Sequence, residues 1–159
     1  MDLSQKQGIE PGRRLKTANW MGPMLAEAGE LGVRSILLFG YHGKLIKLAG
    51  GIFHTHHHVA DGRQEIMAAY CAQAGLETAV VQQVLASKTT EAALQVLRSL
   101  ADSSWVARVY GLLAERIAVR SRTYIRMHTE QTVQVGSVLF DRQRQIIVKS
   151  AIGQTLMPS

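Results

Sequence analysis

Several features that mark special classes of protein are missing from this chain of 159 residues. Cys71 is the only cysteine, so no internal disulfide can form, and a reducing cytoplasm is the expected compartment. The longest apolar stretch, Ser35–Tyr41, is far shorter than the roughly 20 residues that a membrane span needs. Residues 1–14 are polar and lack the apolar core of a secretory signal. There is also no block of like charges such as a nucleic-acid-binding tail would carry.

The composition that remains is that of an ordinary globular protein. The chain is 47% hydrophobic and 19% charged, and its length suits one domain with a buried core. Its net charge is +6 and its pI is about 9.8. This balance favours an acidic partner, which could be nucleic acid, anionic lipid, or a polycarboxylate or phosphate ligand. Net charge alone does not choose among them.

The apolar periodicity predicts a helix-rich α/β domain with a small mixed sheet over residues 17–159, after a flexible lead-in at 1–16. Three- and four-residue spacing predicts helices over 19–31, 44–49, 61–75, 80–85, 89–100 and 105–126. Residues 33–39 form a short apolar run that predicts a buried strand of a parallel or mixed sheet. Further strands are expected over 132–140 and 146–151, with a hairpin turn at 141–144.

The helix expected at 105–126 separates an apolar face from a basic one. Its arginines are Arg108, Arg116, Arg120, Arg122 and Arg126. A solvated surface is the favoured interpretation, and a wall facing an anion is the alternative. A nucleic-acid-binding helix is a third hypothesis, and it predicts an affinity that falls steeply with salt.

A strand–glycine–helix junction at 40–47 is suited to binding an anion. Gly40 and Gly43 allow a sharp turn and a close approach of the backbone to a ligand. The helix that follows directs its N–H groups and its positive dipole end toward that position, and Lys44 and Lys47 add charge on one face. The spacing does not match a Walker loop. A tight turn with solvated lysines is the alternative.

The run at 54–58, HTHHH, holds four of the six histidines of the chain. His54, His56 and His58 would share one face of an extended segment and could ligate a transition metal. However, no HExxH pattern is present, and Asp61 is the only carboxylate nearby. We therefore favour contact with a ligand over a dedicated metal site. A metal-dependent hydrolase built on His54, His56 and His58 is the rival hypothesis.

Asp61-Gly62-Arg63 follows this run directly. The carboxylate and the guanidinium can pair with each other, or Arg63 can act as a two-pronged clamp for a ligand carboxylate. The sequence of these three residues is equally compatible with an internal ion pair and with a clamp for a ligand.

Taken together, these motifs resemble the signature of the cobalt-precorrin-5B C1-methyltransferases (CbiD type), enzymes of anaerobic cobalamin biosynthesis. The resemblance rests on residues 40–56, GYHGKLIKLAGGIFHTH, on residues 59–63, VADGR, and on residues 19–22, NWMG. It extends from about Lys16 to the end of the chain. Family members are about twice as long, so the chain resembles the C-terminal half of a two-domain enzyme, and the N-terminal half is an expected partner.

The resemblance implies methylation of C1 of cobalt-precorrin-5B by S-adenosylmethionine, giving cobalt-precorrin-6A. Cobalt would then enter only as part of the tetrapyrrole substrate, with no metal site on the protein. No nucleic-acid or membrane partner is expected, and a homo-oligomer stays open. The candidate catalytic residues are His54, His56 and Asp61. The candidate substrate- and donor-binding residues are Gly40, Tyr41, His42, Gly43, Lys44, Lys47, Gly50, Gly51 and Arg63.

Overall fold

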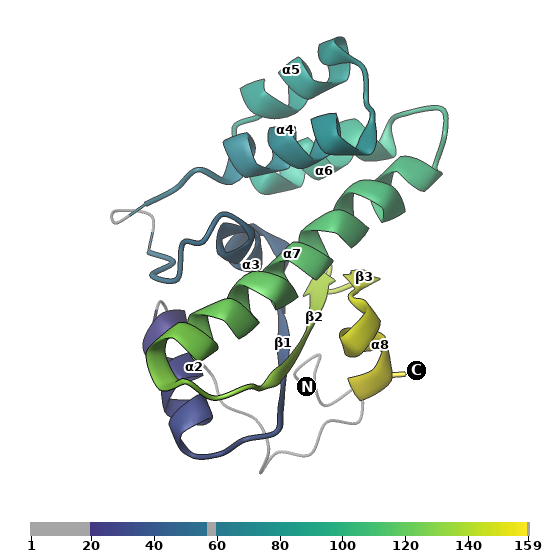
Figure 1. The fold of residues 1–159 in the computed structure, drawn as a ribbon. Helices are drawn as coiled ribbons and strands as arrows, with labels where there is room; N and C mark the ends of the chain where they lie inside the picture. Colours follow the sequence, from purple (N-terminus) through teal and green to yellow (C-terminus); the bar gives the residue numbers. More distant parts are fainter. Residues whose placement is uncertain (1–19, 57–59, 159) are drawn as a thin grey trace.

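The fold is known from a computed structural model, which describes residues 20–56 and 60–158. The lead-in expected at 1–16 lies outside the described residues. Figure 1 shows a long helix, α7 (Ser104–Thr129), that runs the length of the molecule and links its two ends. Beside one end of α7 lie α4 (Arg63–Ala74), α5 (Thr78–Ala86) and α6 (Thr90–Arg98), and beside the other lies α2 (Met21–Glu30). No described helix has the length and apolar character needed to cross a bilayer.

A small mixed sheet packs beside the middle of α7, in agreement with the predicted fold class. Its strands are β1 (Ser35–Tyr41), β2 (Gln134–Phe140) and β3 (Ile146–Lys149), in the order β1-β2-β3. β1 pairs in parallel with β2, and β2 pairs antiparallel with β3. β1 leads directly into α3 (His42–Ala49), which lies between the sheet and α4 (Figure 1).

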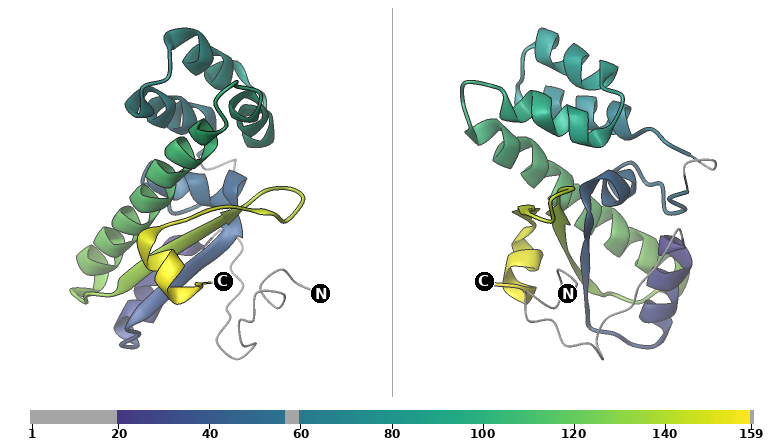
Figure 2. Two further views of the ribbon diagram at one scale, coloured as in Figure 1. Left: turned by 90° about the vertical axis from the view of Figure 1, so that its right-hand side faces the viewer. Right: turned by 180° about the vertical axis from the view of Figure 1, so that it is seen from behind.

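The two faces of β2 are covered by different helices, as the alternation of side chains along a strand requires. The Ser137 hydroxyl donates to the carbonyl of Ala114 in α7 at 2.8 Å. On the opposite face, α8 (Ala151–Leu156) approaches so closely that a Cβ on Gly136 would lie 2.5 Å from the Gly153 nitrogen. Two further views show α8 against the sheet on the side away from α7 (Figure 2). The sheet is therefore the middle of three layers.

The structure corrects three expectations about local structure. β1 is an edge strand among the described residues, and only Leu38 within it is fully buried, because three strands are too few to enclose it. The junction at 40–43 contains no left-handed turn, since the chain passes from extended Tyr41 straight into α3. The strand expected to reach residue 151 ends at Lys149, because Ser150 caps α8 by accepting from the Gly153 N–H.

The apolar core follows the predicted stripe of α7. Val109, Leu113 and Ile117 are fully buried there, against apolar side chains of α3, α4 and β2. Of the five arginines of this helix, Arg108, Arg116 and Arg126 are exposed, as the favoured interpretation of a solvated basic surface expects, whereas Arg120 and Arg122 are half-buried.

Candidate functional site

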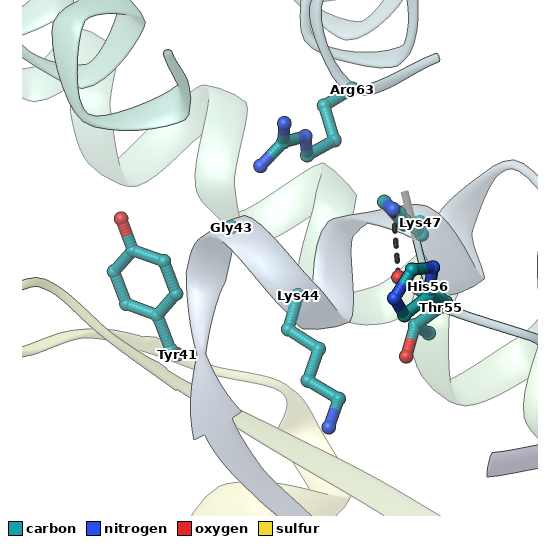
Figure 3. Close-up of a pocket in the computed structure, with 7 residues that line it drawn as sticks. All are labelled: Tyr41, Gly43, Lys44, Lys47, Thr55, His56 and Arg63. Atoms are coloured by element: carbon teal, nitrogen blue, oxygen red, sulfur yellow. Dashed lines mark hydrogen bonds between the residues drawn. The ribbon is translucent and has the colours of Figure 1, made fainter. Parts of the chain in front are cut away.

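A hollow of about 290 Å³ lies where β1 passes into α3. Three segments supply its walls: the start of α3, the histidine-rich segment and the first residue of α4 (Figure 3). The lining residues are Tyr41, Gly43, Lys44, Lys47, Thr55, His56 and Arg63. All but Thr55 belong to the sites proposed from the sequence, so the structure brings residues from all three predicted motifs into one cavity.

The N-terminal turn of α3 forms the floor of this hollow. Gly43 is buried there, and a Cβ at its position would lie 2.5 Å from Cε1 of the Tyr41 ring. Glycine is therefore needed for the ring to lie against the helix. The first turn of a helix also carries the positive end of the helix dipole, which favours an anion.

Lys47 does not present its ammonium group to solvent, although it lines the hollow. Its Nζ donates to the carbonyl of Thr55 at 2.8 Å and to that of Ala60 at 2.9 Å, and the residue is only 3% exposed. Burial lowers its pKa, and the nearby charge of Arg63 lowers it further. Lys47 therefore ties both ends of the histidine-rich segment to α3, which the sequence did not indicate.

Asp61 and Arg63 form a two-pronged ion pair. Nε of Arg63 donates to Oδ1 of Asp61 at 2.7 Å, and Nη2 donates to Oδ2 at 3.1 Å. The hydrogen bond from Arg63 holds the pKa of Asp61 below its usual range. Both side chains are partly exposed, so the pair adds little to stability. Arg63 lines the hollow and Asp61 does not, so the carboxylate orients a guanidinium that borders the hollow.

The histidine run is divided by the structure. His56 lines the hollow. His54 lies outside the lining, with its ring edge-on to Trp20 at 5.2 Å between centroids, and its buried Nδ1 has no hydrogen-bond partner among the described residues. His57 and His58 lie outside the described residues. Within the described ranges no three His, Cys, Asp or Glu side chains gather as metal ligands would, so the metal-dependent hydrolase gains no support.

Three glycines expected at the ligand lie outside the lining. Gly40 is within β1. A Cβ on Gly50 would lie 2.6 Å from Cδ1 of Ile66, so this glycine allows α3 to pack on α4. Gly51 has a φ of +78°, and a Cβ there would lie 2.8 Å from Nη1 of Arg120. Close packing within the protein, rather than approach to a ligand, accounts for these two positions.

His42 corrects a further expectation, because its side chain is fully buried and turned away from the hollow. Its Nδ1 lies 2.8 Å from the Tyr110 hydroxyl, and its Nε2 lies 2.8 Å from Oε2 of Glu91. Burial lowers the pKa of His42, although the adjacent carboxylate opposes this effect. Glu91 and Tyr110 carry no local signal that marks them as partners of His42, because they are 49 and 68 positions away from it in the sequence.

The charges around the hollow suit an anionic ligand. Lys44, Lys47 and Arg63 lie on its walls, and Asp61 neutralises only part of their charge. Lys44 is half-buried, and this burial lowers the pKa of its ammonium group. A carboxylate that entered would meet cationic groups in a setting less screened than bulk solvent.

Comparison with known proteins identifies relatives along nearly the whole chain. The family model described as "CbiD, C-terminal domain" matches residues 54–151. A protein of a Cyanothece strain named cobalt-precorrin-5B C(1)-methyltransferase is 57% identical over 98% of this chain and 42% of its own length. A Nostoc protein of the same name is 53% identical over 99% of this chain and 44% of its own length. The chain thus spans about two-fifths of these relatives. No solved structure matches it.

Proposed function

Because the chain belongs to the CbiD C-terminal domain family, we propose that it is the C-terminal part of an S-adenosylmethionine-dependent enzyme that methylates C1 of cobalt-precorrin-5B to give cobalt-precorrin-6A. The observation that carries this proposal is the identity of 57% with a relative of that name, over 98% of the chain. The cationic hollow supports it independently, since such a substrate carries many carboxylates.

We propose that the hollow binds an acidic arm of the macrocycle rather than the whole ring. Its volume of about 290 Å³ is at the lower limit of the roughly 300–1,000 Å³ typical of sites that enclose drug-sized ligands. Lys44 and Arg63 would pair with the carboxylate, and the first turn of α3 would add its dipole. Of the three candidate catalytic residues, His56 alone lines the hollow, where it would contact the bound arm rather than the carbon that is methylated.

Transfer of a methyl group from a sulfonium donor depends mainly on holding donor and acceptor in line. The role of the protein is therefore to fix the macrocycle at a set position relative to the donor. His54 and Asp61 would contribute indirectly, because His54 packs on Trp20 and Asp61 orients Arg63. The donor itself, S-adenosylmethionine, is inferred from the methyltransferase name of the relatives.

We further propose that the additional length of the relatives supplies the opposite wall of the site. The hollow has walls from only three segments, and large apolar side chains are exposed elsewhere on the described surface: Trp20 is 60%, Leu31 74% and Met127 76% exposed. Contact with another domain would remove such apolar surface from water, which is favourable. The cytoplasmic location and any self-association of the chain stay predictions.

The test is a binding titration with S-adenosylhomocysteine and a cobalt corrinoid that carries free carboxylates, using this chain alone and joined to the N-terminal half of the Cyanothece relative. We expect Lys44→Met and Arg63→Gln to weaken corrinoid binding about tenfold each, since each removes one charge-assisted contact. The matched controls are Lys88→Met and Arg116→Gln, whose side chains are exposed outside the hollow. If the joined protein binds neither ligand, the proposed function is wrong.

A further inference from the structure

A chain of hydrogen bonds, buried at its inner end and partly buried at Glu91, connects the wall of the hollow with the core. The Tyr110 hydroxyl meets Nδ1 of His42 at 2.8 Å, and Nε2 of His42 meets Oε2 of Glu91 at 2.8 Å. The same carboxylate oxygen accepts from the Tyr41 hydroxyl at 3.5 Å. Tyr110 and His42 are fully buried, whereas Tyr41 lines the hollow. The four side chains come from α7, α3, α6 and the end of β1.

The chemistry of the four groups fixes the direction of each bond. An ionised Glu91 can only accept, so Nε2 of His42 donates to it. Nδ1 of a neutral His42 then has no proton and accepts from the Tyr110 hydroxyl. This assignment satisfies both nitrogens of His42, and burial favours the neutral ring because it disfavours charge.

Glu91 has a largely buried carboxylate, which is unusual for a residue with only a structural role. Its side chain is 13% exposed, and its Oε1 is buried without a hydrogen-bond partner among the described residues. A buried polar atom left unpaired costs stability, and such groups are concentrated where function requires them. The first turn of α6 offsets part of this cost, since a carboxylate is favourable at a helix N-terminus.

We propose that Glu91, held in place by His42 and Tyr110, is the positioning residue that orients the Tyr41 phenol as a wall of the ligand site. The ring of Tyr41 already contacts that of His42 edge-on, with 4.8 Å between centroids, and its hydroxyl is directed to Glu91. A tyrosine phenol is neutral at neutral pH, so a wall formed by Tyr41 can border a bound carboxylate without repelling it. The assignment of an acidic ligand rests on the proposed function, but the positioning of Tyr41 does not.

The charges around Tyr41 act in opposite directions on its pKa. Burial raises it most, and the charge of Glu91 on α6 raises it further. Arg142, in the turn between β2 and β3, lowers it both by its charge and by a side-chain hydrogen bond to Tyr41, so Glu91 is not its only polar neighbour. Arg63 on α4 is also close enough to interact with a Tyr41 phenolate. Removing the charge of Glu91 would therefore lower the pKa of Tyr41.

The decisive experiment follows tyrosine Cζ and histidine ring nitrogens by NMR during a pH titration of the isotope-labelled protein. Tyr41→Phe and His42→Gln assign the two signals. We expect His42 to be neutral with its proton on Nε2 at neutral pH. Glu91→Gln should lower the pKa of Tyr41, whereas Glu65→Gln, which removes an exposed carboxylate from the first turn of α4, should leave it unchanged. An unmoved Tyr41 titration in folded Glu91→Gln overturns the proposal.

A double-mutant cycle then tests the link to the ligand site in the joined protein, with the carboxylate-bearing corrinoid as the probe. Glu91→Gln and Tyr41→Phe should each weaken binding about threefold to tenfold, the range expected for one hydrogen bond, and the double variant should lose little more. Additive losses would contradict the coupling.

If Glu91→Gln does not fold, Tyr110→Phe replaces it in the titration, and an unchanged His42 signal there overturns the proposal. Failure of the unaltered joined protein to bind the corrinoid counts only against the proposed function, because the NMR titration needs no ligand.

Discussion

Replacing Lys47 with methionine separates its two proposed contributions, binding of a ligand and attachment of the histidine-rich segment. Methionine keeps the length and apolar character of the side chain but cannot donate. The variant loses the bonds from Nζ to the carbonyls of Thr55 and Ala60, at 2.8 and 2.9 Å. Because Lys47 is only 3% exposed, water replaces these bonds poorly.

The expected cost follows from two opposing contributions. Two hydrogen bonds from a charged donor contribute about 3–6 kcal/mol, taking about 1.5–3 kcal/mol for each. The variant also avoids burying an ammonium ion, which costs several kcal/mol. We expect a net loss of about 2 kcal/mol in the free energy of unfolding. For a chain of this size that corresponds to a fall in Tm of about 4–8 °C.

Urea unfolding followed by circular dichroism measures this loss, and Lys44→Met is the matched control. Lys44 lies on the same helix, lines the same hollow and is less buried than Lys47. We expect Lys44→Met to change stability by less than about 0.5 kcal/mol, as usual for a substitution near the surface, while it weakens binding of an anionic ligand. If Lys47→Met unfolds at the same urea concentration and with the same slope as the unaltered protein, the proposed tie to the loop is wrong.

Three further predictions concern packing and protonation. Gly136→Ala should destabilise the protein by about 1–3 kcal/mol in urea unfolding, because its Cβ would meet the backbone of Gly153. Gly43→Ala should displace the Tyr41 ring, which would shift the NMR signals of that ring and weaken corrinoid binding. The lowered pKa of His42 means that below about pH 6.5 the unfolded chain binds a proton that the folded one resists, so the Tm should fall as the pH drops from about 7.5 to 5.5.

Each of these has its own control. Gly111→Ala adds a methyl group in open space on α7 and should be neutral or stabilising by up to about 1 kcal/mol, so an equal loss at Gly136 and Gly111 would contradict the packing argument. Unchanged NMR signals of the Tyr41 ring in Gly43→Ala would contradict this prediction, because they would mean that the added Cβ does not displace the ring. In His42→Gln the Tm should depend less on pH over the same interval, and an equal dependence would assign the proton to another group.

Local patterns predicted most of the secondary structure. The helices α2, α4, α5, α6 and α7 carry apolar residues at helical spacing, which is a property of neighbouring residues and needs no knowledge of the fold. Thr89 was expected near the start of α6, and its hydroxyl oxygen accepts from the Ala92 N–H there. α8 was missed because it is only six residues long and contains Gly153, so its apolar stripe is too short to recognise.

The candidate site was predictable as far as its residues are close in sequence. Gly43 to Arg63 span the start of α3, the histidine-rich segment and the start of α4, and a strand–helix junction followed by a short loop brings them together by local geometry alone. The predicted anion site at this junction therefore coincides with the hollow. Thr55 was missed although it lies within the histidine run, because only the imidazoles were considered.

The sequence by itself determined the fold class and the segment that carries the site, since both depend on the order of apolar, glycine and charged residues along a short stretch. Tertiary structure decided which of those groups line the hollow. Lys47 and His42 lie beside residues of the hollow in sequence, yet their polar atoms bind the carbonyl of Ala60 and the side chains of Glu91 and Tyr110. Those partners reach them only when α6, α7 and the loop pack on α3, because burying a polar group requires a partner that the folded chain alone supplies.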